Sequence, residues 1–438
     1  MSLNLKEIIK GLILQHTFSV VLVCLRVGVI VYKKKERRLI VKLFFSFTIF
    51  FNFILCAEAQ VSAAMQRNPN VNSQSELYTR FLYEPIEGLG YERGVNRRDP
   101  SSIIYYNDKY YVWYTRNTST TSKWLDADIW YATSIDGKKW EEIGPAVKRG
   151  PKGSWDDWSV FTCNIFVAND KYYLTYQAET KTHVPEKKQG CGINVVAMAW
   201  AHSPDGPWNK LDKPILETAS DGKFDLPDPK QIWKKRVLEK GSWDSSAVHD
   251  PEIIPRWGKY WLYYKGHGID NLLYSDSRWG VAVSDHPEGP YIKSKYNPVT
   301  NSGHEVWVWP WRNGIAAMID WAGPECHTVQ YTEDGVNFEV VCSLEDIPPA
   351  GGAYIADKFK DPANGKGFSW GLCHYGRSDW NFLLRFNCDL EQGKQKKRDW
   401  KYFPHYSTVR DVMHNPSRFN IPTEALYRKP LREDALDN

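Results

Sequence analysis

The sequence lacks any strong excess of charge of one sign. Its 438 residues include 56 lysines and arginines against 52 aspartates and glutamates, a formal net charge of only +4. Such a balance provides no basic surface for nucleic acid, so we expect no nucleic-acid partner and no attraction to an anionic membrane surface. A chain of this length can hold one large domain or two ordinary ones.

Cysteine is scarce, at 8 residues, and the six cysteines beyond residue 60 do not follow the spacing of a zinc site. In an oxidising compartment, Cys326–Cys342 or Cys373–Cys388 could bridge neighbouring strands. Free, buried thiols are an equally good interpretation of the same residues. Both interpretations therefore stay open at the level of the sequence.

Helical periodicity is also lacking between Asp99 and Asn387, where β-branched and aromatic residues dominate. Aromatic residues make up 14% of the chain, including 20 Trp and 25 Tyr. Because aromatic side chains favour strands, this composition indicates a β-rich fold. We expect most of the rings to serve packing and a handful to stack on the apolar faces of sugars.

The first 60 residues contain the three parts of a secretory signal peptide. The basic run Lys33–Arg38 is followed by an apolar run from Leu43 to Leu55 and by the small-residue site Ala57-Glu58-Ala59. This apolar run is shorter than the roughly 20 residues that cross a bilayer. We therefore expect residues 1–60 to be an upstream extension and signal peptide, and the protein to be exported, periplasmic or secreted. A two-helix membrane hairpin is the alternative.

A similar aromatic phrase returns along the chain. Lys109–Tyr114, Lys171–Tyr176 and Lys259–Tyr264 each follow a tight-turn dipeptide, and weaker copies lie at Gly314–Asp320 and Phe368–His374. Short strands joined by turns and recurring about every 50–90 residues are typical of a radial array of blades. Five copies predict an all-β, five-bladed β-propeller. A β-sandwich is the structural alternative, but it does not explain the repetition.

The repeats delimit the rest of the chain. Residues 86–393 form the predicted propeller, and residues 61–85 are predicted to be a helical segment that is too short to form a core alone. Residues 394–438 open with a basic, polar run and are expected to be a surface tail.

Polar residues stand where the predicted inner strands begin. In a propeller these starts surround one axis, so their side chains converge on a single pocket. Asp99-Pro100 and Asp250-Pro251 each precede an apolar run, and His304-Glu305 precedes a third. Proline lacks a backbone donor, which suits the start of an inner strand. A single aspartate before proline often only caps a turn, but two at equivalent repeat positions favour a shared site.

Convergent carboxyl groups are the groups that hydrolyse glycosidic bonds. In the inverting reaction a base activates water and an acid protonates the leaving oxygen, with the two groups roughly 6.5–9.5 Å apart. Asp99, next to Arg97 and Arg98, is expected to stay ionised and to serve as the base.

The acid has two candidates. His304 has an ordinary pKa near neutrality, and Glu305 is its neighbour, and the residues themselves do not rank the two. Asp250 could orient the sugar and raise the proton affinity of the acid.

On these motifs the chain resembles glycoside hydrolase family 117, the 3,6-anhydro-L-galactosidases or α-1,3-L-neoagarooligosaccharide hydrolases. The similarity extends from Ser62 onward. Ser62-x-Ala64-x-x-Arg67 looks like the N-terminal helical motif of the family, which implies a domain-swapped homodimer. The run Gly88–Ser102 looks like its first-blade signature.

The resemblance implies roles for the convergent residues. Asp99 becomes the general base, Asp250 the carboxylate that modulates the pKa of the acid, His304 the general acid and Glu305 a substrate-binding neighbour. The implied reaction is exo-hydrolysis, with inversion, that releases 3,6-anhydro-L-galactose from agar-derived oligosaccharides. No cofactor is required for it. A divalent cation in the pocket is implied by the family alone, since no histidine or carboxylate cage stands out in the sequence.

Weaker candidates for substrate binding complete the prediction. Trp130 and Trp158 could stack on a sugar, and Thr162, Gln177 and His249 could form hydrogen bonds to hydroxyl groups. Taken singly, each is better explained by packing within a blade.

Two other functions are compatible with these features. A family 43-like arabinofuranosidase or xylosidase would use Glu305 as its acid. A non-catalytic, sugar-binding propeller would share the export signal and the aromatic content, but it would not need clustered carboxyl groups.

Overall fold

The computed structural model describes residues 75–120, 122–180, 194–225, 236–267, 277–321, 323–344, 347–354, 369–376, 379–388, 417 and 420–422. The chain divides into two compact units, 1–67 and 68–438, and every described residue belongs to the second. The predicted signal peptide, residues 61–74 of the predicted helical segment and most of the tail lie outside the described residues. Within the ranges given, no helix has the length and apolar character to cross a bilayer.

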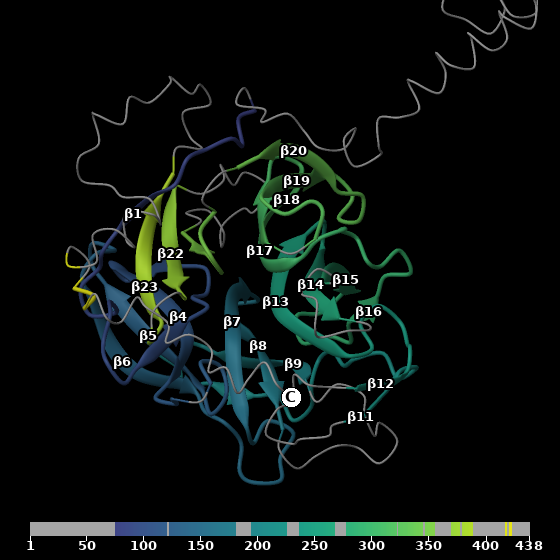
Figure 1. The fold of residues 1–438 in the computed structure, drawn as a ribbon, viewed down its shortest axis with the longest axis horizontal. Helices are drawn as coiled ribbons and strands as arrows, with labels where there is room; N and C mark the ends of the chain where they lie inside the picture. The colour runs from purple at the N-terminus through teal and green to yellow at the C-terminus, as the bar shows by residue number, and fades with distance from the viewer. Residues whose placement is uncertain are drawn as a thin grey trace, which may run out of the picture. The chain divides into compact units, whose positions relative to one another are not determined.

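Five antiparallel sheets form the five blades of a β-propeller, as the repeats predict (Figure 1). The first blade has β2 (Asn96–Arg98), β3 (Ile104–Tyr106), β4 (Lys109–Asn117), β5 (Asp128–Ser134) and β6 (Trp140–Val147). The second has β7 (Ser159–Ala168), β8 (Lys171–Glu179), β9 (Asn194–Ala201) and β10 (Asn209–Lys210). The third has β13 (Ala247–Arg256), β14 (Lys259–His267), β15 (Arg278–Ser284) and β16 (Ile292–Lys293).

The fourth blade has β17 (His304–Trp311), β18 (Gly314–Trp321), β19 (Thr328–Thr332) and β20 (Glu339–Ser343). The fifth has β21 (Gly352–Ala353), β22 (Trp370–Tyr375), β23 (Phe382–Asn387) and β1 (Leu82–Glu84). A separate hairpin pairs β11 (Lys223–Asp225) with β12 (Arg236–Glu239).

The repeated aromatic phrase is the second strand of a blade. It forms β4, β8 and β14, and its weaker copies form β18 and β22. These strands are buried on both faces because a blade lies between two neighbours, so their residues do not alternate between apolar and polar. Trp113 of β4, for example, is fully buried and packs edge-to-face on Trp208 of the second blade at 5.7 Å.

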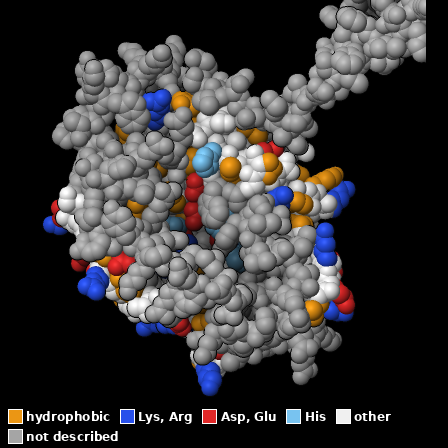
Figure 2. All heavy atoms as spheres, viewed as in Figure 1, with side chains coloured by type: hydrophobic (Ala, Val, Ile, Leu, Met, Phe, Trp, Pro, Cys, Tyr) orange, Lys and Arg blue, Asp and Glu red, His pale blue; other side chains and the backbone are white. Residues whose placement is uncertain are grey.

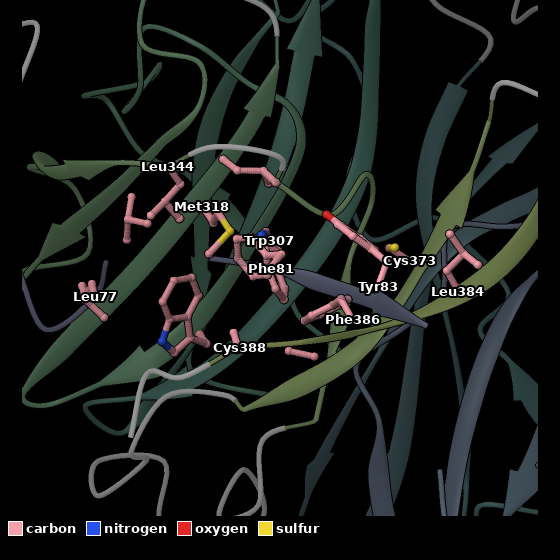
Figure 3. Close-up of a cluster of buried hydrophobic side chains, with 14 of the residues drawn as sticks. Leu77, Phe81, Tyr83, Trp307, Met318, Leu344, Cys373, Leu384, Phe386 and Cys388 are labelled. Atoms are coloured by element: carbon pink, nitrogen blue, oxygen red, sulfur yellow. The ribbon is translucent and has the colours of Figure 1, made fainter. Parts of the chain in front are cut away.

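The described part of the predicted N-terminal helical segment contains no helix. Leu82–Glu84 instead forms β1, which pairs antiparallel with β23. The strand covers an edge of the fifth blade that would otherwise expose unpaired backbone groups. Leu77 and Phe81, just before β1, are buried in the same apolar cluster as Trp307 and Phe386 (Figure 3). A segment that precedes the first blade thus completes the last one and closes the ring.

The structure also bears on the predicted C-terminal tail and on the suggested disulfides. Ile421, from the predicted surface tail, is buried in the same apolar cluster as Leu77. The described cysteines are all free thiols, so neither of the two suggested disulfides forms. These cysteines are Cys163, Cys326, Cys342, Cys373 and Cys388.

Candidate active site

Every blade carries one left-handed residue where its inner strand approaches the centre. These residues are Asp99 (φ 50°), Thr162 (φ 45°), Asp250 (φ 50°), Glu305 (φ 53°) and Ala350 (φ 44°). The pairing register of β7 and β13 shifts at this point, and the inner strand of the first blade is divided there into β2 and β3. A left-handed conformation costs an L-residue about 1–2 kcal/mol. Because it occurs in all five blades, we infer a common role. It interrupts the regular backbone pairing at one residue of each blade and directs that residue to the pocket.

These five residues line one pocket with a volume of about 230 Å³. Figure 2 shows it as a hollow in which acidic side chains are visible. The volume lies below the roughly 300–1,000 Å³ of pockets that enclose drug-sized ligands, so the pocket suits a single small ring. The predicted convergence of Asp99, Asp250 and His304–Glu305 is therefore present in the structure.

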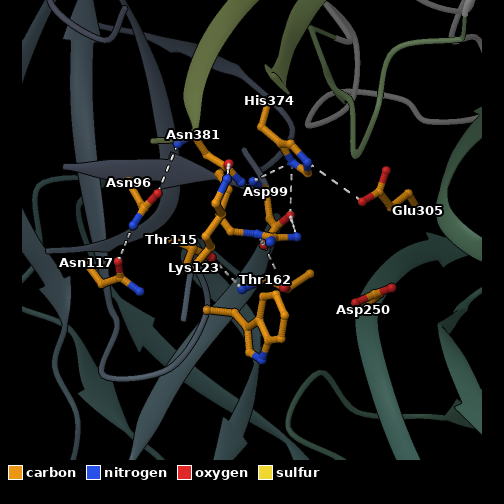
Figure 4. A network of polar contacts seen from close by, with 12 residues as sticks. Asn96, Asp99, Thr115, Asn117, Lys123, Thr162, Asp250, Glu305, His374 and Asn381 are labelled. Atoms are coloured by element: carbon orange, nitrogen blue, oxygen red, sulfur yellow. Dashed lines mark hydrogen bonds and ion pairs between the residues drawn. The ribbon is translucent and has the colours of Figure 1, made fainter. Parts of the chain in front are cut away.

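Asp99 is held by three side chains (Figure 4). Arg98 donates to both of its carboxylate oxygens, from Nε to Oδ2 at 2.7 Å and from Nη2 to Oδ1 at 3.1 Å. The hydroxyl of Thr162 donates to Oδ2 at 3.1 Å, and Nδ1 of His374 lies 3.2 Å from Oδ1. Burial would raise the pKa of Asp99, but the charge of Arg98 and the hydrogen bond from His374 outweigh it and hold that pKa well below its usual range. Asp99 is therefore ionised at any working pH.

Asp250 has a different partner. Its Oδ2 lies 2.5 Å from Nζ of Lys265, which is on β14 and has a side chain only 4% exposed. Burial raises the pKa of Asp250, and repulsion by Asp99 and Glu305 adds to this, so the attraction of Lys265 does not lower it to its ordinary value. The two aspartates therefore differ in proton affinity although they occupy equivalent positions.

His304 and Glu305 form the third side of the pocket. Nδ1 of His304 lies 3.3 Å from Nζ of Lys265, and its Nε2 lies 3.8 Å from Oε1 of Glu305. Nε2 of His374 is also 3.8 Å from this oxygen, so His374 stands between Asp99 and Glu305 (Figure 4). Burial lowers the pKa of His304 well below 6.5, and the charge of Lys265 lowers it further. The imidazole is therefore neutral at neutral pH in the free protein, whereas the sequence suggested a pKa near working pH.

A polar wall from the second blade faces the same pocket. It consists of Gln177, Glu179 and Asn194, which are all buried. Nε2 of Gln177 donates to Oε1 of Glu179 at 3.4 Å, and Asn194 donates to the same oxygen. Oε1 of Gln177 is buried and has no hydrogen-bond partner among the described residues. It is an acceptor available to a ligand hydroxyl.

The remaining predicted residues divide into two groups. Thr162, Gln177 and His249 line the pocket. Trp130 and Trp158 do not. The ring of Trp130 is covered by the guanidinium of Arg116 at 4.0 Å, and Trp158 is buried with its backbone N–H bonded to the carbonyl of Glu179 at 3.0 Å.

Arg97 also points away from the pocket, because its guanidinium is paired with Glu92 at 2.6 Å and Glu142 at 2.9 Å. Of the two arginines expected to keep Asp99 ionised, only Arg98 contacts it. The pocket has an aromatic wall elsewhere: Trp124 lines it, and its ring lies 5.6 Å from Cζ of Arg98. Trp124 was not predicted from the sequence.

Lys265 and His374 were also not predicted, although a signal for them exists. Lys265 pairs with His249, the residue before the left-handed Asp250. The amide of His374 donates to the carbonyl of Pro349, the residue before the left-handed Ala350. Both side chains therefore occupy equivalent places on their second strands. Gln177 occupies the same place opposite Phe161. In the sequence, Lys265 and Gln177 directly follow the last tyrosine of the repeated phrase. Aligning the repeats one residue further would have brought these positions together.

The donor set does not fit a divalent cation. Among the described residues no group of three or more His, Cys, Asp or Glu side chains is placed to hold a metal. Two of the pocket carboxylates, Asp99 and Asp250, are each paired with a protein cation, Arg98 and Lys265 respectively. These cations already supply the positive charge that a metal would bring.

The comparisons with known proteins point to glycoside hydrolases. Residues 95–245 match the family model of the glycosyl hydrolases family 32 N-terminal domain. The structure is similar to that of Zg3597, a family 117 glycoside hydrolase from the marine bacterium Zobellia galactanivorans, with 32% identity, a TM-score of 0.61, and coverage of 76% of this chain and 94% of that one. A solved structure described only as a glycoside hydrolase shares 14% identity over 75% of this chain and 95% of that one, at a TM-score of 0.47. Among curated proteins none matches.

Proposed function

Since the chain belongs to glycoside hydrolase family 117, we propose that it is an exo-acting, inverting hydrolase of α-1,3-linked neoagarooligosaccharides. It would release 3,6-anhydro-L-galactose from the non-reducing end. The observation that carries this proposal is Asp99, a carboxylate kept ionised by Arg98 inside a pocket the size of one sugar ring. A buried, ionised carboxylate is the group that an inverting hydrolase needs to activate water.

The proposed reaction assigns one task to each convergent residue. Asp99 accepts a proton from the attacking water, and Nε2 of His304 gives a proton to the leaving oxygen as the glycosidic bond breaks. Asp250 acts on His304 through Lys265, which contacts both. Gln177 and Glu305 bind hydroxyl groups of the sugar, and Trp124 takes the stacking role first expected of Trp130 and Trp158.

The charge of the pocket supports an uncharged substrate. Carboxyl groups outnumber cations among its described residues, so an anionic sugar would be repelled. The acidic residues are Asp99, Glu179, Asp250, Glu252 and Glu305, and the basic ones are Arg98 and Lys265. Anhydrogalactose carries no charge and meets this condition.

The test is incubation with neoagarobiose and analysis of the products by NMR. We expect release of 3,6-anhydro-L-galactose, with the anomeric configuration inverted in the first-formed product. Asp99→Asn serves as the inactive control. Release of arabinose or xylose from the corresponding glycosides, with none from neoagarobiose, would contradict the proposed substrate.

Glu305 remains a second candidate for the acid because burial leaves His304 neutral. In a family 43-like mechanism Glu305 would donate the proton. Glu305→Gln would then abolish turnover while His304→Gln would keep it. Our assignment predicts the opposite order, with His304→Gln lowering kcat by about 10²–10⁴-fold.

The exported location and the domain-swapped dimer accompany this proposal. Both rest on the sequence motifs before residue 68, which lie outside the described residues. Mass spectrometry of the mature N-terminus and light scattering in solution would test them.

A further inference from the structure

The buried side chain of Lys265 contacts both Asp250 and His304. Nζ of Lys265 lies 2.5 Å from Oδ2 of Asp250 and 3.3 Å from Nδ1 of His304. A lysine ammonium has three N–H donors and no acceptor. Nδ1 of His304 must therefore be the acceptor in this contact. In a neutral imidazole, the ring proton then resides on Nε2.

The surroundings of His304 oppose a second proton on its ring. Burial disfavours the imidazolium, and Lys265, His267 and Arg98 disfavour it further, while Asp99 favours it. A general acid must carry a proton at the pH where it works. A neutral His304 meets this requirement only if its Nδ1 gains a proton as its Nε2 loses one.

We propose that Lys265 is a positioning residue that holds His304 as the Nε2–H tautomer and supplies, at Nδ1, the proton that His304 loses at Nε2. The proposal deepens the function given above and rests on it. Lys265 is suited to this task because its Nζ contacts Nδ1 directly, and an ammonium group has N–H donors and no acceptor.

The step balances in atoms and charge. Water attacks the anomeric carbon and gives a proton to the carboxylate of Asp99. The bond from the anomeric carbon to the leaving oxygen breaks, and its electron pair stays on that oxygen, which takes the proton from Nε2 of His304. Nδ1 takes a proton from Nζ of Lys265. Asp99 is then protonated, Lys265 is a neutral amine and His304 carries its ring proton on Nδ1. After the products leave, Nδ1 returns its proton to Nζ of Lys265, Nε2 takes a proton from solvent, and Asp99 gives its proton to solvent.

Asp250 explains why Lys265 points at His304. Its carboxylate accepts a hydrogen bond from Nζ and fixes the direction of the remaining N–H groups. Other charged or titratable groups also act on this pair. They are Arg98 and Asp99 from the first blade, His249 and His267 from the third, and Glu305 from the fourth.

Two substitutions distinguish proton supply from a purely structural ion pair. Lys265→Arg keeps a cation next to Asp250, but arginine does not release its proton in proteins. We expect its kcat to fall about 100-fold, within the range of general acid catalysis, with KM nearly unchanged. Lys265→Met removes the repelling charge, so His304 can take a proton from solvent. We expect this variant to be inactive at neutral pH and to regain activity as the pH falls.

The matched control is Lys293→Met. Lys293, on β16 of the third blade, also forms a 2.5 Å ion pair with an aspartate, Asp244, but it does not line the pocket. We expect full activity from it. Wild-type kcat for Lys265→Arg, or a loss in Lys265→Met that is the same at every pH, would overturn the proposal.

A measurement without substrate keeps the two proposals separate. Nitrogen-15 NMR of the wild-type protein should show His304 as the Nε2–H tautomer, with Nδ1 unprotonated at neutral pH, and its pKa should rise in Lys265→Met. A protonated Nδ1 in the free wild-type protein would overturn the role of Lys265. Failure to cleave neoagarobiose would instead contradict the proposed substrate and leave this NMR result as it stands.

Discussion

Asp99 and Asp250 are the same residue in the same place on two different blades. Both precede a proline, both have φ of 50°, and both face the central pocket. The pKa of Asp99 is nevertheless lowered and that of Asp250 is raised. The backbone is common to the two sites, so the difference comes from the neighbouring side chains. Arg98 donates hydrogen bonds to both oxygens of Asp99, whereas Lys265 contacts one oxygen of Asp250.

This comparison shows how a repeated fold produces unlike roles. The left-handed residue of each blade delivers a side chain to the pocket and does not define what that side chain does. Enzymes that use two carboxyl groups separate their roles by giving them environments that move their pKa values apart. Here the first blade favours a permanent carboxylate and the third favours a carboxyl group with higher proton affinity.

Replacing each aspartate by asparagine should separate the two sites most clearly. Asp99→Asn removes the proposed base, so we expect kcat/KM on neoagarobiose to fall about 10³–10⁴-fold. Asp250→Asn leaves base and acid in place and should cost about 10–100-fold. Asp108→Asn, at an exposed hairpin turn, is the control and should be fully active. Equal losses from the two pocket variants would contradict distinct roles.

Removing Arg98 should make Asp99 behave more like Asp250. In Arg98→Met, burial raises the pKa of Asp99 without the attraction that now outweighs it. The acidic limb of the profile of kcat/KM against pH should therefore move to higher pH. We expect a loss of about 10–100-fold at mildly acidic pH and a smaller one at neutral pH. An acidic limb at its wild-type position would show that Arg98 does not control Asp99.

Thr162 tests a smaller part of the same environment. Its hydroxyl donates to Oδ2 of Asp99 at 3.1 Å. Thr162→Val keeps the shape but removes the donor, and a hydrogen bond to a charged group contributes about 1.5–3 kcal/mol. We expect kcat/KM to fall about 10-fold, because Asp99 loses one of the hydrogen bonds that fix the orientation of its carboxylate. Thr162→Ser retains the hydroxyl and should recover most of this activity.

Thermal stability should show the contrast without any substrate. Asp99 has a lowered pKa, so its stabilising contribution is present above its ordinary pKa of 3.8 and is lost as the pH falls. Asp250 has a raised pKa, so burial of its charge costs stability at neutral pH and that cost disappears on acidification. The Tm of Asp99→Asn relative to wild type should therefore rise as the pH falls, and that of Asp250→Asn should decline.

We expect each of these changes to be about 1–2 °C between neutral pH and about pH 3, measured by differential scanning fluorimetry. Asp108→Asn is a suitable control, because Asp108 is exposed at a hairpin turn and does not line the pocket. Slopes of the same sign for the two pocket variants would contradict opposite pKa shifts.

Much of the fold could be predicted from local pattern. The phrases at Lys109, Lys171 and Lys259 each became the second strand of a blade, because a strand buried on both faces needs apolar residues at every position. The role of Leu82–Glu84 as β1 could not be predicted. Its partner, Phe382–Asn387, lies about 300 residues away, and no local period reveals such a pairing.

The candidate site was predictable in part for the same reason. Asp99, Asp250 and His304 stand next to prolines or apolar runs that mark inner strands. Lys265 and His374 sit on second strands, where their neighbours in sequence look like core residues. Trp124 and Trp130 are only six positions apart in the chain. Trp124 lines the pocket, whereas the ring of Trp130 is covered by Arg116, and the local sequence does not distinguish the two.

The sequence by itself determined the number of blades, the inner-strand carboxyl groups and their convergence, because turns and buried strands are local properties of the chain. The tertiary structure decided which cation meets which carboxylate. Arg98 and Asp99 are adjacent in the chain, but Lys265, Asp250 and His304 come from three strands of two blades. A pKa depends on charges within a few ångströms in space, and only the closed ring of blades brings those charges together.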